Sequence, residues 1–129
     1  MTIMRTWLSA TFLVLGVSTA FADGDVANGE RAFSKCSACH SIENPRTRMG
    51  PHLMGVVGRS AGSVADYKYS QAMTDAGAGG MVWTEDNLRE FLSSPKKKVP
   101  GTSMRFFGLW SESEINDLIA YLKTVQAPQ

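Results

Sequence analysis

The residues best suited to chemistry in this chain form one short cluster, Cys36-Ser37-Ala38-Cys39-His40. Two thiols three positions apart at the end of a helix can each add across one vinyl group of the same haem. The histidine that follows is then held beneath the iron, where a ring nitrogen can serve as a ligand. The C-x-x-C-H spacing is the sequence signature of covalent haem attachment, and it predicts a single haem c bound here.

Three other kinds of site share the C-x-x-C spacing: a redox dithiol, a structural disulfide and half of a zinc site. A zinc site needs four ligands, and the chain offers only these two cysteines with His40 and His52. A thioredoxin-type dithiol is expected beside a βαβ unit, for which the sequence shows no pattern. An oxidising compartment would permit a disulfide. The adjacent histidine favours haem, and an apo thiol protein remains the alternative.

A haem with two axial ligands needs a partner for the histidine, and methionine is the usual one in cytochromes c. The chain has seven methionines, each of which could otherwise be core filler. Met104 stands out because it lies in Val99-Pro100-Gly101-Thr102-Ser103-Met104, where proline and glycine fix a rigid turn. Met73 and Met81 are the candidates to consider if Met104 is not the ligand.

Three segments have the patterns of helices that would position these residues. The first runs from about Asp25 to Lys35 and leads directly into the cysteines. The second begins after Trp83 with Thr84 as its N-cap, and Pro95 stops it. The third begins at a capping box, Ser111-Glu112-Ser113-Glu114. The expected apolar faces of the first and third helices are Val26, Gly29, Ala32 and Phe33, and Ile115, Leu118, Ile119, Leu122 and Val125.

Residues 41–82 form a long stretch without convincing strand alternation, and they hold seven of the twelve glycines. A structureless loop of this length usually argues against an assignment, but wrapping around a bound prosthetic group would explain it. Within it, residues 76–80 are interpreted as a short flexible insertion. The expected fold is therefore all-α, with three main helices and long loops wrapped around one haem.

Residues 1–22 have the features of a secretory signal peptide. Arg5 belongs to a short basic region, the 17 residues Thr6–Ala22 are uncharged, and Ala20-Phe21-Ala22 is an A-x-A cleavage site. Cleavage after Ala22 would leave one domain, residues 23–129, in the periplasm. Because 17 residues is at the lower limit for spanning a bilayer, an uncleaved membrane anchor is the alternative.

The charges are almost balanced, with 13 Lys and Arg against 12 Asp and Glu. This balance indicates neither nucleic acid nor an acidic membrane as a partner, and any steering must come from local patches. The one dense run is Lys96-Lys97-Lys98, which Arg46, Arg48 and Arg105 could join. Lysine runs are usually solvated surface, but this one could be a docking ring for acidic redox partners.

Taken together, the motifs resemble class I cytochrome c, close to the mitochondrial cytochrome c and bacterial cytochrome c2 branch. The resemblance runs from Gly24 to about Lys123 and is highly specific. Its parts are Gly24-Asp25-Val26-x-x-Gly29, Cys36 to His40, Gly50-Pro51-x-Leu53-x-Gly55, Gly58-Arg59, Trp83, Pro95-Lys96-Lys97, Pro100-Gly101-Thr102-x-Met104 and Asp117-Leu118-Ile119-Ala120-Tyr121-Leu122-Lys123.

The resemblance implies roles for particular residues. His40 and Met104 would be the axial ligands, and the Pro51 carbonyl would accept the other ring N–H of His40. Gly29 would let the first helix cross the last closely, with an aromatic pair, Phe33 and Tyr121, at the crossing. The residues expected to bind or shield the haem propionates are Arg59, Tyr69 and Trp83, with Thr102 nearby.

The chain departs from the family pattern at three positions. His52 stands where asparagine is common, Met73 where asparagine often joins a buried polar network, and Phe91 where tyrosine often donates to the methionine sulfur. The expected function is a monomeric one-electron carrier between membrane complexes and periplasmic dehydrogenases or oxidases, not an enzyme. The alternative is a haem enzyme or gas sensor with a labile sixth ligand.

Overall fold

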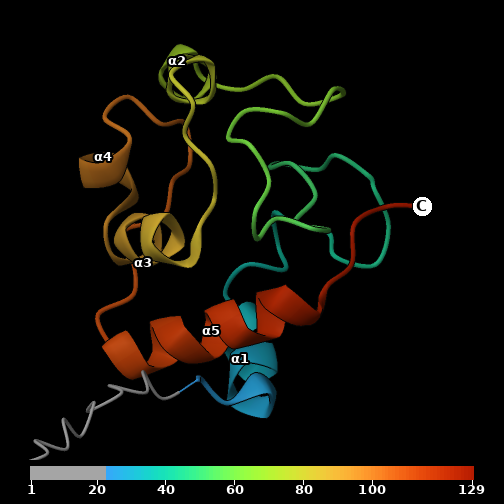
Figure 1. Ribbon diagram of the computed structural model, residues 1–129, viewed down its shortest axis with the longest axis vertical. Coiled ribbons are helices and arrows are strands. Elements are labelled where there is room, and N and C mark those ends of the chain that lie inside the picture. Colours follow the sequence, from blue (N-terminus) through green and yellow to red (C-terminus); the bar gives the residue numbers. More distant parts are fainter. Residues whose placement is uncertain (1–22) are drawn as a thin grey trace, which may run out of the picture.

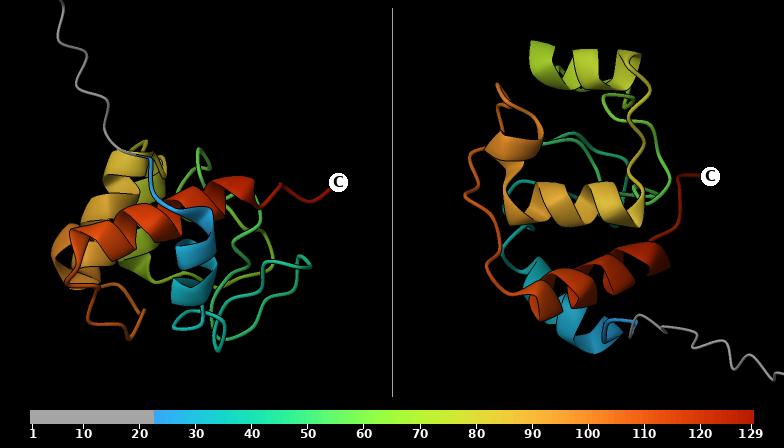
Figure 2. Two further views of the ribbon diagram at one scale, coloured as in Figure 1. Left: turned by 90° about the horizontal axis from the view of Figure 1, so that it is seen from below. Right: turned by 60° about the vertical axis from the view of Figure 1, so that its left-hand side comes forward.

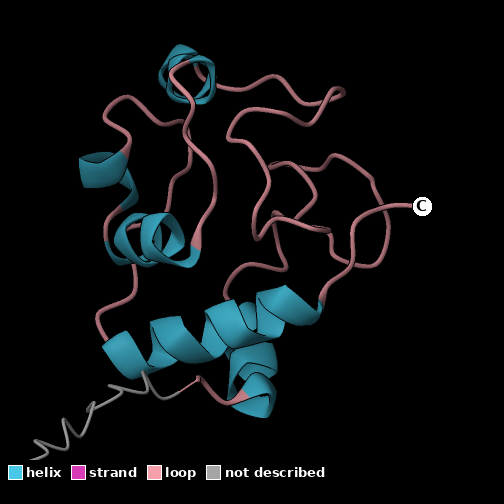
Figure 3. Cartoon of the chain, viewed as in Figure 1, coloured by secondary structure: helices cyan, strands magenta, loops and turns pink. Residues whose placement is uncertain are grey.

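The computed structural model describes residues 23–129, where the chain forms five helices joined by long loops (Figures 1 and 3). The helices are α1 (Val26–Phe33), α2 (Gln71–Ala78), α3 (Glu85–Ser93), α4 (Pro95–Lys98) and α5 (Glu112–Thr124). In this part of the chain the only β pairing is an isolated antiparallel bridge between Ser60 and Val82. The expected all-α class is confirmed, and the expected signal peptide lies outside the described residues.

The helices are arranged in levels, with α2, α3 and α5 stacked and α1 beneath α5 (Figures 1 and 2). Among residues 23–129 no helix has the length and apolarity needed to cross a bilayer. The core lies between α3 and α5 and continues under the loops. Its most deeply buried apolar side chains are Leu118, Ile119, Leu122, Val99, Val56, Ala61 and Ile115.

Helices α1 and α5 cross at very close range. A Cβ on Gly29 would come within 3.0 Å of the Asp117 carbonyl group, so only glycine fits at this point. The rings of Phe33 and Tyr121 pack at the crossing with centroids 5.8 Å apart, as the resemblance implied. Val26, which was expected on the buried face, is 45% exposed.

The predicted helix starts are confirmed. Thr84 caps α3 by accepting a hydrogen bond from the Asn87 amide at 3.2 Å. Ser111 caps α5 by accepting from the Glu114 amide at 3.3 Å. The Glu114 carboxylate pairs with Lys35 after α1 instead of returning to the cap, so it ties the two crossing helices together.

Helix α2 lies where the sequence predicts a long loop and a flexible insertion, so this part of the prediction is wrong. Ser70 caps it by accepting from the Met73 amide at 3.1 Å. Its small residues leave no apolar stripe in the sequence, and Met73 is its one buried side chain. Gly77 lies against the Ala61 carbonyl, where a Cβ would clash, so tertiary packing rather than periodicity stabilises this helix.

Proline has two effects at the end of α3. Pro95 follows the end of α3 at Ser93, as predicted, and it also occupies the first turn of α4. Proline is favoured there because its missing N–H would have had no helical partner and its φ angle suits the helix. This second effect was missed, and it places the lysine run 96–98 on a short helix.

Candidate functional site

The cysteines and the histidine lie on one compact turn that follows α1. The amides of Cys39 and His40 both donate to the Cys36 carbonyl, at 3.1 and 3.0 Å. Both cysteines are half-buried and neither is in a disulfide. The turn therefore holds two thiols and an imidazole in one place, as the spacing predicted.

The proton position on His40 follows from its partner. Nδ1 of His40 lies 2.7 Å from the Pro51 carbonyl oxygen. Because a carbonyl can only accept, Nδ1 must carry the proton, and Nε2 is left with its lone pair. Burial lowers the pKa of His40, which keeps the ring neutral at pH 7. A neutral imidazole with one nitrogen anchored and the other free is the form that binds a metal.

Gly50 makes room for the His40 ring. A Cβ at this position would come within 3.0 Å of two ring atoms, Cε1 and Nδ1. The Gly50 amide also donates to the Cys39 carbonyl at 3.0 Å, which fastens the segment carrying Pro51 to the cysteine turn. The glycine of the Gly50-Pro51 motif therefore orients the histidine.

A reactive dithiol and a zinc site both fit the structure poorly. Burial raises the pKa of the Cys36 thiol to about 11, and nearby Lys35 opposes this only in part. A reactive dithiol needs the opposite shift, because the thiolate is the nucleophile. Among residues 23–129, which include both cysteines and both histidines, no group of three or more His, Cys, Asp or Glu side chains could hold a metal ion.

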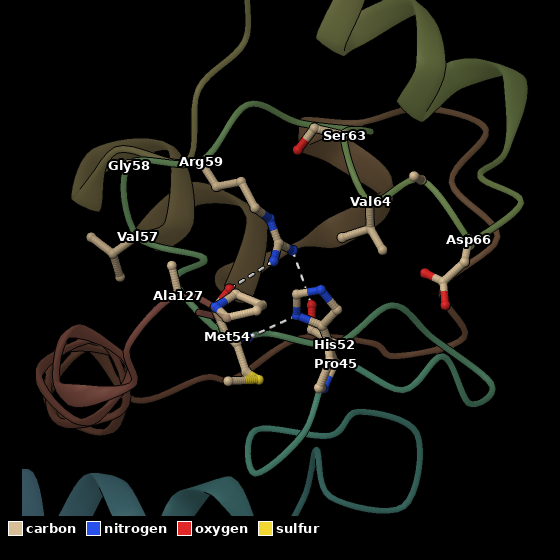
Figure 4. A pocket seen from close by; sticks show the side chains of 13 residues that line it. Pro45, His52, Met54, Val57, Gly58, Arg59, Ser63, Val64, Asp66 and Ala127 are labelled. Carbon is tan, nitrogen blue, oxygen red and sulfur yellow. Dashed lines mark hydrogen bonds between the residues drawn. The ribbon is translucent and has the colours of Figure 1, made fainter.

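Arg59 is held by the loop that follows the Gly50-Pro51 motif. Its guanidinium donates to the carbonyls of Met54 at 3.0 Å and His52 at 3.1 Å (Figure 4). Its Nε–H is buried and has no hydrogen-bond partner among the described residues. Such an orphaned charged donor in a native fold calls for an acceptor, and a carboxylate would satisfy it best.

Trp83 and Tyr69 lie close to Arg59. The Trp83 amide donates to the Arg59 carbonyl at 2.9 Å, and the Trp83 carbonyl accepts from Gly58 at 2.9 Å. Trp83 is buried and packs on Phe91 with ring centroids 4.9 Å apart. The Tyr69 hydroxyl accepts from the Val64 amide at 3.1 Å, so its own O–H remains available to donate.

Met104 lies in a fixed turn and is half-buried against the core. The Thr102 amide donates to the Val99 carbonyl at 3.0 Å, and the Thr102 hydroxyl accepts from the Met104 amide at 3.3 Å. Gly101 has a φ of +92°, which side-chain-bearing residues rarely adopt. Met73 and Met81 also contact the core, Met73 as a buried member.

His52 has a structural role that the sequence did not reveal. It is only 8% exposed, and its Nδ1 accepts from the Met54 amide at 3.2 Å, so the ring is neutral. It borders a pocket of about 650 Å³ between this loop and the C-terminal residues Ala127 and Pro128 (Figure 4). No sequence signal marked it beyond its replacement of a common asparagine.

The pKa of His52 is lowered by burial and by the Arg59 charge, with Asp66 opposing. The unfolded chain therefore binds a proton at a higher pH than the folded one, and stability falls as the pH drops below about 6.5. We expect the free energy of unfolding, measured with denaturant between pH 5 and 8, to show this loss. In a His52→Asn variant the loss should be smaller, and an unchanged pH dependence would contradict the assignment.

The three lysines of residues 96–98 differ in exposure and in ion pairing. Lys98 pairs with Glu90 at 2.5 Å, and its side chain is only 21% exposed. Lys96 and Lys97 are exposed, and the Lys96 ammonium lies 5.9 Å from the centroid of the Phe107 ring. Two of the three lysines are thus available to a partner.

These residues fit a covalently bound haem. Cys36 and Cys39 supply adjacent thiols, His40 supplies a free Nε2, and Gly50 leaves room for the ring. The orphaned Nε–H of Arg59 suits a propionate carboxylate. The donor set therefore matches the chemistry of haem attachment.

Comparisons with known proteins agree with this chemistry. The sequence model of the family "Cytochrome c" matches residues 26–126. Cytochrome c2 of Agrobacterium tumefaciens (strain II Chrys) is 54% identical over 101 residues, covering 78% of this chain and 91% of the relative. Cytochrome c2 of Blastochloris viridis is 38% identical over 125 residues, covering 96% of each.

The fold agrees as well. Cytochrome cH from Methylobacterium extorquens superimposes with a TM-score of 0.72 at 45% sequence identity, covering 78% of this chain and 99% of that one. A family match across most of the chain, with relatives at this level of identity, shows more than a shared architecture. The chain belongs to the class I cytochromes c, and it is an electron-transfer protein with one covalently bound haem c, not an enzyme.

Proposed function

We propose that this chain carries single electrons between redox proteins of the periplasm, with His40 and Met104 as the axial ligands of its haem. The haem supplies the one-electron couple when it is bound. The observation that carries the proposal is the 2.7 Å contact from Nδ1 of His40 to the Pro51 carbonyl. It fixes the ring and its tautomer, so that Nε2 is presented as a ligand without further rearrangement.

The remaining site residues have separate tasks in this proposal. Cys36 and Cys39 would hold the haem covalently through two thioether bonds. Arg59, whose buried Nε–H has no partner among the described residues, would donate it to a propionate. Tyr69 would donate its hydroxyl, and the buried Trp83 would shield the same region. These donors would offset the cost of burying a carboxylate, which is several kcal/mol or more when it is unpaired.

Met104 is favoured as the second ligand over Met73 and Met81 because of its turn. The hydrogen bonds made by Thr102 and the glycine conformation at Gly101 hold the Met104 backbone in place. A fixed backbone leading into Met104 would reduce the entropy lost when the thioether binds iron. Thr102 is therefore a positioning residue for Met104.

Docking would use the exposed lysines Lys96 and Lys97, whose charges attract acidic partners and raise encounter rates. Lys98 contributes less because Glu90 neutralises it. We propose a monomer that needs neither nucleic acid nor membrane binding, exported by a signal peptide that is cleaved after Ala22.

The test is to export the chain in a host that attaches haem, and then to measure its intact mass and absorption spectra. We expect a haem-sized mass increment on a chain that begins at Asp23, and a far-red band of methionine-sulfur ligation when oxidised. A chain that retains Met1 would indicate a membrane anchor. A haem without the band would favour a labile sixth ligand, and a chain without haem would refute the proposal.

A further inference from the structure

The loop between α4 and α5 is drawn in orange in Figure 1. It exposes two large aromatic side chains. Phe107 is 89% exposed and Trp110 is 97% exposed. Met104 and Phe106, in the same loop, pack against the core. The loop therefore buries some of its apolar side chains and exposes two of the largest to solvent. We call these two residues, Phe107 and Trp110, the aromatic patch.

The backbone beneath the aromatic patch is fixed. Gly108 has a φ of +112°, and a Cβ there would clash with the Ser93 carbonyl of α3. The next amide, that of Leu109, donates to the Leu92 carbonyl at 2.8 Å, and the Leu109 side chain is buried. The two rings are thus presented on a rigid support, which lowers the entropic cost of binding through them.

Basic residues outnumber acidic ones around the aromatic patch. Residues 95–110 contain four basic residues and no acidic one, and the exposed Glu112 follows in the first turn of α5. Lys98 is neutralised by Glu90, whereas Lys96 lies over the Phe107 ring and Lys97 and Arg105 are exposed. The surface therefore combines two aromatic side chains with three cations that have no carboxylate partner within residues 23–129.

We propose that the aromatic patch anchors the redox partner, whose docking face carries an apolar recess bordered by carboxylates. This inference rests on the proposed function and adds the chemistry of the partner to it. Tryptophan and arginine are enriched among the residues that dominate binding energy at interfaces, usually inside a ring of weaker polar contacts. Apolar contact is not screened by salt, so binding keeps a salt-independent part beneath the electrostatic one.

Two other occupants are less suited to this surface. Anionic membranes are recognised by clusters of about four to eight basic residues or by amphipathic helices. Here there are three cations, two on the four-residue helix α4 and one on the loop that follows it. A symmetric dimer would place the same patch opposite itself, so Lys96, Lys97 and Arg105 would face their own copies and repel them. A partner of opposite charge avoids both problems.

The test is the oxidation of reduced holoprotein by a purified bacterial cytochrome oxidase in detergent, over a range of ionic strength. For the double variant Phe107→Ser, Trp110→Ser we expect KM to rise about tenfold at every ionic strength, which corresponds to about 1.4 kcal/mol of binding. The kcat, the absorption spectrum and the reduction potential should stay at wild-type values. The double variant Lys96→Gln, Lys97→Gln should instead flatten the salt dependence.

Val26→Ser is the matched control, because it removes a half-exposed apolar side chain from α1, away from the patch. Its KM should equal that of the wild type. A KM unchanged by the aromatic substitutions would overturn the inference and leave the electron-carrier function intact. Wild-type holoprotein that the oxidase does not oxidise would overturn both.

Two further measurements distinguish a redox partner from a membrane and from a second copy of the chain. Sedimentation with phosphatidylglycerol vesicles should leave the holoprotein in the supernatant, and analytical ultracentrifugation should give a monomer. Vesicle binding that the Trp110→Ser substitution abolishes would show that the aromatic patch binds a membrane instead of the proposed partner. Dimerisation that the same substitution abolishes would show that it binds a second copy of the chain.

Discussion

Replacing Met104 by alanine is expected to abolish the far-red band of the oxidised holoprotein. It should also lower the reduction potential by on the order of 0.1 V or more, within the range of about 0.8 V that axial ligands control. A thioether ligand raises the potential because it favours the reduced iron over the oxidised one. Absorption spectroscopy and a redox titration of the purified variant measure both effects.

The controls are the other methionines that reach the core. Met81→Ala and Met73→Ala should both keep the far-red band, since we assign the ligand to the turn that carries Met104. Met73 is buried, so its truncation should cost about 2–5 kcal/mol of stability while the spectrum stays unchanged. A band that survives in Met104→Ala and disappears in Met81→Ala would move the ligand to Met81.

The parts of the fold that could be predicted from sequence are those with local causes. Ser111 and Thr84 cap helices because their hydroxyls accept from amides three residues further on. The apolar repeat of α5 is long enough for its periodicity to be unambiguous. The same is true of the cysteine turn, where adjacent residues alone place the thiols and His40 together.

The parts that were missed depend on distant contacts. Helix α2 is stabilised by Gly77 against Ala61 and by the burial of Met73, and neither contact leaves a periodic signal. The pairing of Lys98 with Glu90 joins two helices, α3 and α4, and the sequence pattern gives no sign that one lysine of the run is paired. Apolar residues in the 99–110 loop likewise do not reveal which of them face outward.

The haem site shows the same division. The C-x-x-C-H motif predicted that Cys36, Cys39 and His40 would lie together. The resemblance predicted that the Pro51 carbonyl would hold His40. Neither indicated that His52 and Met54 would hold Arg59 through their carbonyls, or that the Arg59 Nε–H would lack a partner. Those facts depend on how one loop closes on itself, which residue types alone do not specify.

The crossing of α1 and α5 is where a single methyl group should have its largest effect on stability. In Gly29→Ala the new Cβ would lie against the Asp117 carbonyl and 2.7 Å from the Tyr121 Cβ. Helix propensity by itself favours alanine by about 1 kcal/mol. Overpacking against backbone costs about 1–3 kcal/mol or more, because the two helices must separate. Because the Cβ would meet rigid backbone, the upper end of that range applies, and we expect a net loss of about 2 kcal/mol, measured by denaturant unfolding of the oxidised holoprotein.

A second glycine separates the clash from any general effect of alanine. Gly79 follows α2 with a φ of −76°, and a Cβ there would lie 3.3 Å from its nearest neighbour, the Asp75 carbonyl oxygen. Gly79→Ala should therefore change stability by no more than about 0.5 kcal/mol. If Gly29→Ala proved as stable as the wild type, helix propensity would outweigh the clash. The two helices could then move apart at little cost in stability, and glycine would not be required at the crossing.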